Sequence, residues 1–232
     1  MDFLVISDHA EGLGVMYEVY NGNPAFTSDE TLRRWGKAMN AGGREAARAT
    51  NEVVAAQSSG TLPKAVTNPK ISGPIMKSVW QEYTQTADDF NDPGRFTAMI
   101  GYEWTSVPGG NNLHRNILFR GNKNSADQLM PFSSWQSEDV EKLWAWMGKY
   151  EQLTGDRVLA IPHNSNLSNG RMFESTRFDG SPIDLEYLQS RARWEVLAEV
   201  MQTKGNSETH PGLSPNDEFA NYGIAGWEYG NL

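Results

Sequence analysis

Cysteine is absent from the sequence, and basic residues are outnumbered by acidic ones. Without cysteine there are no disulfides, thiolate nucleophiles or cysteine-ligated metal sites, so any metal must be held by histidine, aspartate or glutamate. The 20 basic and 29 acidic residues give a net charge of −9, which argues against a nucleic-acid or anionic-membrane partner. The 11% of aromatic residues excludes wholesale disorder.

Long hydrophobic segments are also absent. No apolar run approaches the roughly 18 residues that cross a bilayer. Asp2 follows the first methionine and the first basic residue is Arg33, so the positive region of a signal peptide is missing and no targeting segment is predicted. The compartment therefore stays open. Because domains seldom start on a buried strand, the apolar run that begins at Phe3 leads us to expect further sequence upstream.

Short apolar runs, most of them ending in a polar or ionisable residue, predict β-strands covered on both faces. The runs span residues 3–9, 96–103, 113–119, 157–163 and 194–202. Helices are predicted over residues 28–57, 72–88 and 183–193, and from residue 137 onward. This alternation predicts a single α/β domain over residues 1–232, with a mostly parallel sheet or barrel.

The few histidines lie at or near the ends of the predicted strands. His9, His114 and His163 lie at or beside strand ends, and His210 lies in the loop after the last run. Glu103 also ends a predicted strand. The carboxyl ends of strands build the active sites of α/β barrels, and imidazole with carboxylate suits Zn, Mn and Fe(II). The pattern therefore predicts a metal site.

Each of these residues also has a structural interpretation. A single histidine at a strand end is more often a hydrogen-bonded structural residue than a ligand. His9 could cap the next helix, Glu103 could pair with Arg115, and His210 could belong to a polar turn. The joint pattern favours Glu103, His114 and His163 as ligands.

Competing catalytic motifs are weak. The sequence contains no G-x-S-x-G elbow, phosphate-binding P-loop or G-x-G-x-x-G fingerprint. A glycoside hydrolase remains an alternative, because Glu103 with Glu199 or Glu208 would supply two carboxylates. The eight tryptophans and eight tyrosines would suit sugar stacking, although most are predicted to lie in the core. This alternative leaves the placement of the histidines unexplained.

At these residues the sequence resembles the PHP (polymerase and histidinol phosphatase) superfamily of metal-dependent hydrolases. More closely, it is similar to a bacterial branch described as a domain of unknown function. The matching stretches are DFLVISDHAEGLG, IGYEWTS with NNLHRNILFRG, LAIPHNSNLSNG, and MQTKGNSETHP with LSPNDEFANYG. The resemblance implies a distorted (β/α)7 barrel with up to three divalent metals, Mn, Zn or Fe, at the carboxyl ends of its strands.

The resemblance also implies roles for individual residues. Glu103 matches the bridging glutamate that holds one metal together with the counterparts of His114 and His163, and His9 matches a ligand of a third metal. The opening His-x-His strand and the closing Asp-x-His strand of the superfamily have no counterpart in this sequence. We therefore expect an incomplete barrel, truncated at both ends, in which only the Glu103–His114–His163 site is complete.

The expected activity is hydrolysis of a small phosphate or sulfate ester by a metal-activated water. Arg115 and Lys204 are predicted to bind the anionic group of the substrate, and Asn164 to orient a ligand or substrate. An ordinary salt bridge is the alternative for both cations. No catalytic acid or base is assigned, the oligomeric state is open, and a non-catalytic fragment is a further alternative.

Overall fold

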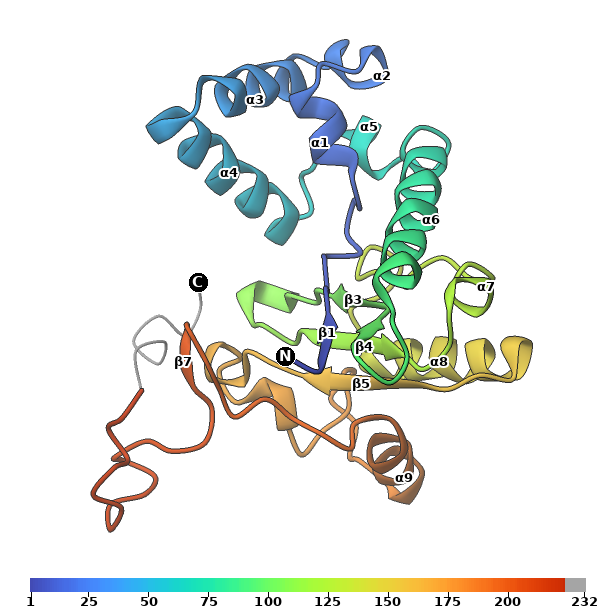
Figure 1. The fold of residues 1–232 in the computed structure, drawn as a ribbon. Coiled ribbons are helices and arrows are strands. Elements are labelled where there is room, and N and C mark those ends of the chain that lie inside the picture. Colours follow the sequence, from blue (N-terminus) through green and yellow to red (C-terminus); the bar gives the residue numbers. More distant parts are fainter. Residues whose placement is uncertain (224–232) are drawn as a thin grey trace.

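The computed structural model describes residues 1–223, which form helices and small sheets (Figure 1). The helices are α1 (Val15–Tyr20), α2 (Pro24–Thr27), α3 (Glu30–Ala41), α4 (Gly43–Ser58), α5 (Lys64–Thr67), α6 (Ser72–Phe90), α7 (Lys123–Ala126), α8 (Val140–Thr154) and α9 (Leu185–Trp194). The strands are β1 (Phe3–Val5), β2 (Thr97–Met99), β3 (Gly101–Trp104), β4 (Arg115–Phe119), β5 (Val158–Pro162), β6 (Met201–Gln202) and β7 (Gly205–Asn206). Short 3₁₀ turns are η1 (Pro108–Gly110), η2 (Ser165–Leu167) and η3 (Arg171–Phe173).

The helices begin where the sequence places capping residues. The Asp29 side chain accepts a hydrogen bond from the backbone N–H of Leu32 at the start of α3, and Asp139 does the same for Glu141 at the start of α8. The predicted helix over residues 28–57 is interrupted at Gly42, whose φ of 72° and ψ of −171° are not helical. The helices predicted over residues 72–88 and 183–193 are confirmed as α6 and α9.

The main sheet is antiparallel, which corrects the expectation of a mostly parallel one. Strand β4 pairs antiparallel with both β3 and β5. The loop between β3 and β4 contains no α-helix, and without such a crossover the chain returns antiparallel. Parallel pairing occurs between β1 and β2 and at a bridge between His9 and Glu103. The described residues form an α/β structure with small sheets and no closed barrel.

The last predicted strand, residues 194–202, is wrong. Trp194 ends α9, and within this range only Met201–Gln202 form a strand. Val196 and Leu197 are 61% and 56% exposed, so their side chains are not buried as those of a strand covered on both faces would be. The predicted strand over residues 96–103 is divided between β2 and β3, and the one over residues 3–9 is regular only in β1.

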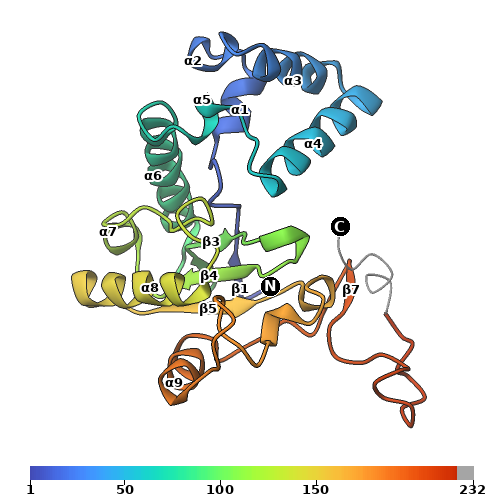
Figure 2. The same ribbon diagram turned by 180° about the vertical axis from the view of Figure 1, so that it is seen from behind.

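Two clusters of buried side chains form the core. The larger cluster packs β3, β4 and β5 against α6 and α8, with Trp80, Tyr102 and Phe119 in its centre. The smaller one joins α1 to α5, and Met76 of α6 packs against both. Helices α1 to α5 therefore gather at one end of the molecule and the main sheet at the other, as Figure 2 shows from behind. No described helix has both the length and the apolar character that a membrane crossing requires.

Candidate metal centre

The antiparallel sheet brings three predicted ligands to one edge. Glu103 lies in the fully buried strand β3, His114 directly precedes β4, and His163 directly follows β5. Because β4 runs opposite to its neighbours, its start lies beside the ends of β3 and β5. A backbone hydrogen bond from the N–H of His163 to the carbonyl of His114, 3.1 Å long, holds the two histidines side by side.

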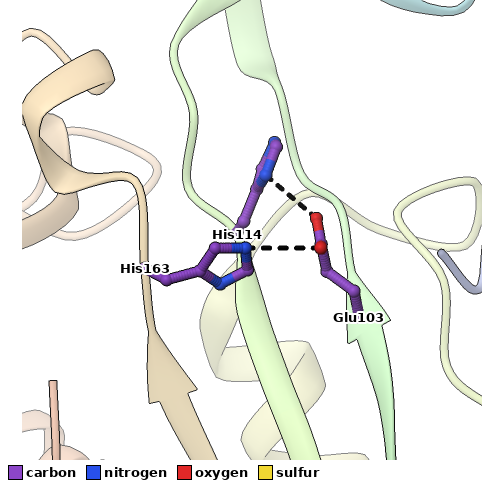
Figure 3. A group of neighbouring side chains, drawn as sticks. All are labelled: Glu103, His114 and His163. Carbon is purple, nitrogen blue, oxygen red and sulfur yellow. Dashed lines mark ion pairs between the residues drawn. The ribbon is translucent and has the colours of Figure 1, made fainter. Parts of the chain in front are cut away.

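The three side chains point toward one another (Figure 3). His114 Nδ1 lies 3.0 Å from Glu103 Oε1, and His163 Nε2 lies 3.3 Å from Glu103 Oε2. Each residue offers one ligand atom to a group in which all such atoms lie within 4.8 Å of one another. All three residues are buried, so the group is a preformed cluster rather than a chance meeting of surface side chains.

The charge state of the cluster suits a cation. Burial raises the pKa of Glu103, but hydrogen bonds with His114, His163 and His9 outweigh this effect, so the pKa of Glu103 is lowered and its carboxylate is ionised. Burial lowers the pKa of His114, which keeps that imidazole neutral at neutral pH. A carboxylate with neutral imidazoles is the ligand set of Zn, Mn and Fe(II), so the residues present fit a divalent metal.

His9 approaches the same carboxylate from the solvent side. Backbone hydrogen bonds on either side of His9, between residues 8 and 103 and between residues 10 and 103, place its ring beside Glu103. His9 Nδ1 lies 3.3 Å from Glu103 Oε1, and the His9 side chain is 63% exposed. The hydrogen bond with Glu103 raises the pKa of His9 against the opposing effect of burial. His9 therefore forms the open side of the cluster.

Two further residues support the cluster and were not predicted. Thr105 Oγ1 donates to Glu103 Oε1 at 3.1 Å and lies 2.6 Å from His9 Nδ1. Its position two residues after Glu103 in an extended chain puts both side chains on one face, a spacing that could have revealed it. Glu11 is a buried carboxylate that accepts from the backbone N–H groups of Thr105 and Ser134. Nothing in the sequence signals that Glu11 is buried.

The predicted substrate-binding residues lie in three different environments. Arg115 is buried, and its Nε donates to Glu195 Oε1 at 3.0 Å, so the guanidinium takes part in a salt bridge, the alternative considered for it. Asn164 is also buried, and its Nδ2 lies 3.1 Å from His114 Nδ1. Lys204 is exposed, and its charge lies near enough to His9 to oppose the rise in the pKa of that imidazole.

The residues of the alternative interpretations lie outside the cluster. His210 Nδ1 accepts from the backbone N–H of Gly212 at 3.1 Å, as in the polar turn considered for it. The two carboxylate oxygens of Glu199 accept hydrogen bonds from Gln202 Nε2, at 2.8 and 3.0 Å. Glu208 is exposed in the segment after β7. The structure therefore groups histidines, and not Glu199 or Glu208, with Glu103.

Comparison with known protein families gives a match over the whole chain. The model of the family described as "Protein of unknown function (DUF3604)" matches residues 1–232. The chain belongs to this family. Comparison with curated proteins and with solved structures finds no match. The description of DUF3604 states no activity, so the chemistry of the cluster carries the functional argument.

Proposed function

We propose that this DUF3604 protein is a metal-dependent hydrolase of small phosphate or sulfate esters, and that its sheets belong to a distorted (β/α)7 barrel of the PHP type. The observation that supports the proposal is the convergence of Glu103, His114 and His163 at one edge of the sheet. These three residues would hold one divalent cation. Such a cation supplies Lewis acidity, which activates water and stabilises the negative charge that develops on an ester during hydrolysis.

The surrounding residues provide the means to bind an anionic substrate. Glu103 supplies a negative charge to the cation, while the buried imidazole of His114 stays neutral and keeps a lone pair available. His9 faces solvent beside the same carboxylate, and its raised pKa favours the protonated form that attracts an anion. Lys204 adds a positive charge near His9, which makes this rim locally basic in a chain of net charge −9.

Metal analysis tests the binding site directly. The purified protein, loaded with Zn²⁺ or Mn²⁺ and desalted, should retain metal, and His163→Ala should lose it. His210→Ala is the matched control, since it removes a histidine that lies outside the cluster, and it should retain metal like the wild type. Equal metal content in wild type and His163→Ala would refute the site.

Hydrolysis assays separate the proposed activity from its alternatives. Nitrophenyl phosphates and nitrophenyl sulfate should be hydrolysed by the metal-loaded protein and not after treatment with EDTA. A glycoside hydrolase would instead cleave nitrophenyl glycosides, resist EDTA and lose activity in Glu103→Gln. The contacts of Glu199 with Gln202 speak against its use as the second carboxylate. Metal retention without turnover of any ester would identify a non-catalytic fragment.

A further inference from the structure

Strand β1 is apolar and yet largely exposed. Phe3 and Leu4 in this strand are 65% and 39% exposed, and Ile6, which directly follows it, is 53% exposed. Figure 1 shows β1 in front of the main sheet. Among the described residues β1 pairs with β2 alone, so its other edge is open. An exposed apolar strand with an open edge is a place where another strand can pair.

The backbone of β1 has unused hydrogen-bonding groups along this edge. In a parallel pair, alternate residues direct both of their backbone groups toward the neighbouring strand. The carbonyl of Asp2 accepts from the N–H of Thr97, so Asp2 and Leu4 face β2. The N–H and C=O groups of Phe3 and Val5 therefore point to the open edge. An added strand would pair these groups, whereas a helix or a small apolar molecule would leave them unpaired.

A groove of about 540 Å³ lies between α6 and the strands β1 and β2. Leu4 and Ala98, which are paired in register, line the strand side of the groove together with Ile6. Apolar side chains of α6 line the other side, from Val79 to Phe90, which is 70% exposed. Because paired residues of neighbouring strands share a face, alternate side chains of a strand added to β1 would lie on the same face as Leu4 and cover this groove.

Strand β1 of a second copy has the properties that this position requires, since it is extended and apolar. In an antiparallel pair with a twofold axis at Leu4, Phe3 of each copy lies opposite Val5 of the other. The outward backbone groups of Phe3 and Val5 then bond to one another in both directions. Leu4 and Ile6 of each copy lie on the face of the groove. Asp2 lies opposite Ile6, so no like charges are paired.

We propose that the open edge of β1 is a dimer interface, at which β1 of two copies pair antiparallel about Leu4. An axis of this kind places α6 of both copies on the same face of a four-stranded sheet, in the order β2–β1–β1–β2. The two grooves join, and Leu4, Ile6 and Phe90 of both copies are covered. None of the three residues of the metal cluster takes part in the pairing, so the dimer is independent of the proposed function.

Two variants weaken this interface and leave the backbone pairing of β1 with β2 in place. Val5→Pro removes an N–H that points to the open edge, and Phe90→Ser removes an apolar side chain from the groove. Phe219→Ser is the matched control, since Phe219 is 69% exposed in the segment after β7. Analytical ultracentrifugation of the wild type should show a dimer at micromolar concentrations. The Kd of the dimer should rise about tenfold or more in both variants and stay unchanged in the control.

The absence of cysteine allows a direct test of the register. Leu4→Cys introduces the sole thiol of the chain at the twofold axis. Residues paired there without hydrogen bonds have Cα atoms about 4.5 Å apart, which is within the range that a disulfide spans. Oxidation should therefore join two copies of Leu4→Cys. Leu213→Cys is the control, since Leu213 is 74% exposed outside the interface, and it should be joined far more slowly.

Three results would overturn the dimer. The first is a wild type that stays monomeric at these concentrations; uptake of a hydrophobic dye by such a monomer would assign the groove to a different partner. The second is an unchanged Kd in folded Phe90→Ser, and the third is oxidation of Leu213→Cys as fast as that of Leu4→Cys. Circular dichroism verifies folding, and Phe90→Ser with Leu4→Cys suffices if Val5→Pro fails to fold.

Discussion

Replacing Arg115 by methionine should destabilise the fold, because this change breaks a buried ion pair. Arg115 Nε lies 3.0 Å from Glu195 Oε1, and both side chains are only 2% exposed. Arg115 also donates to the carbonyl of Leu113 at 2.6 Å. The variant would leave the carboxylate of Glu195 in the core without its guanidinium. Removing one partner of a buried ion pair costs about 3–5 kcal/mol.

The remaining neighbours of Glu195 place the expected loss near the lower end of that range. Trp144 Nε1 still donates to Glu195 Oε1 at 3.1 Å, and Arg191 Nε lies 3.8 Å from Oε2. We therefore expect a loss of about 3 kcal/mol. The double variant Arg115→Met with Glu195→Leu removes both charges and leaves Trp144 without its acceptor. Its loss should be about 1–3 kcal/mol smaller than the sum of the two single variants.

Urea unfolding followed by tryptophan fluorescence measures these differences. The matched control is Arg120→Met, since Arg120 Nε lies 3.1 Å from Asp156 but its side chain is 69% exposed. An ion pair whose cation faces solvent in this way contributes about 0–1 kcal/mol. If Arg115→Met cost no more than Arg120→Met, the argument from burial would be refuted, and the interpretation of Arg115 as a contact of the substrate would regain support.

Three further predictions concern the support of the site, the sheet and the cation. Burial raises the pKa of Glu11, so the stability that this group contributes falls as the pH rises above the ordinary carboxyl pKa. Glu11→Gln should therefore gain stability relative to wild type as the pH rises above that value, by at most about 1.4 kcal/mol per pH unit in urea unfolding. Gly101→Ala should cost about 1–3 kcal/mol, because a Cβ would lie 2.8 Å from a backbone oxygen of β4, whereas Gly73→Ala, with nothing within 4 Å, should be neutral or stabilising. Zinc at 100 times its Kd should raise the free energy of unfolding by about 2.7 kcal/mol in wild type and not in His163→Ala, measured with EDTA as the reference.

The helices could be predicted because their signals are local. Asp29 and Asp139 accept hydrogen bonds from backbone groups two or three residues away, and such pairs are visible in the sequence. Gly42 can also be seen in the sequence, but a glycine does not by itself show whether a helix ends there. Since Gly42 and Gly43 both have positive φ, the polar continuation after α3 turns away as a separate helix, α4.

The strands could be located but not paired. The run over residues 194–202 is rich in apolar residues, yet a strand also needs a neighbouring strand. Among the described residues this run meets β5 through the backbone N–H of Glu199, which donates to the carbonyl of Pro162 at 3.0 Å. The direction of β4 depends on whether the chain crosses over the sheet or returns along it. Apolar character is the same in both cases, so the sequence predicted a mostly parallel sheet where an antiparallel one forms.

The candidate ligands could be found because their side chains are rare and occur at strand ends, whereas the partners of the residues beside them could not. The contact of Arg115 with Glu195 spans 80 residues, and that of Asn164 with His114 spans 50. Arg115 follows the ligand His114, and Asn164 follows the ligand His163. When only these neighbours in sequence are known, both residues resemble contacts of a substrate. The structure gives each a long-range partner that a substrate would have to displace.

This difference has a physical origin. A metal ligand binds through its own side-chain atoms, so the residue types glutamate and histidine alone indicate that a metal could bind. The role of an amide depends on which end faces which partner, and the partners of Asn164 are Gln202 and His114, which lie 38 and 50 residues away in the sequence. Contacts over such distances are set by the fold, and no local pattern in the sequence contains them.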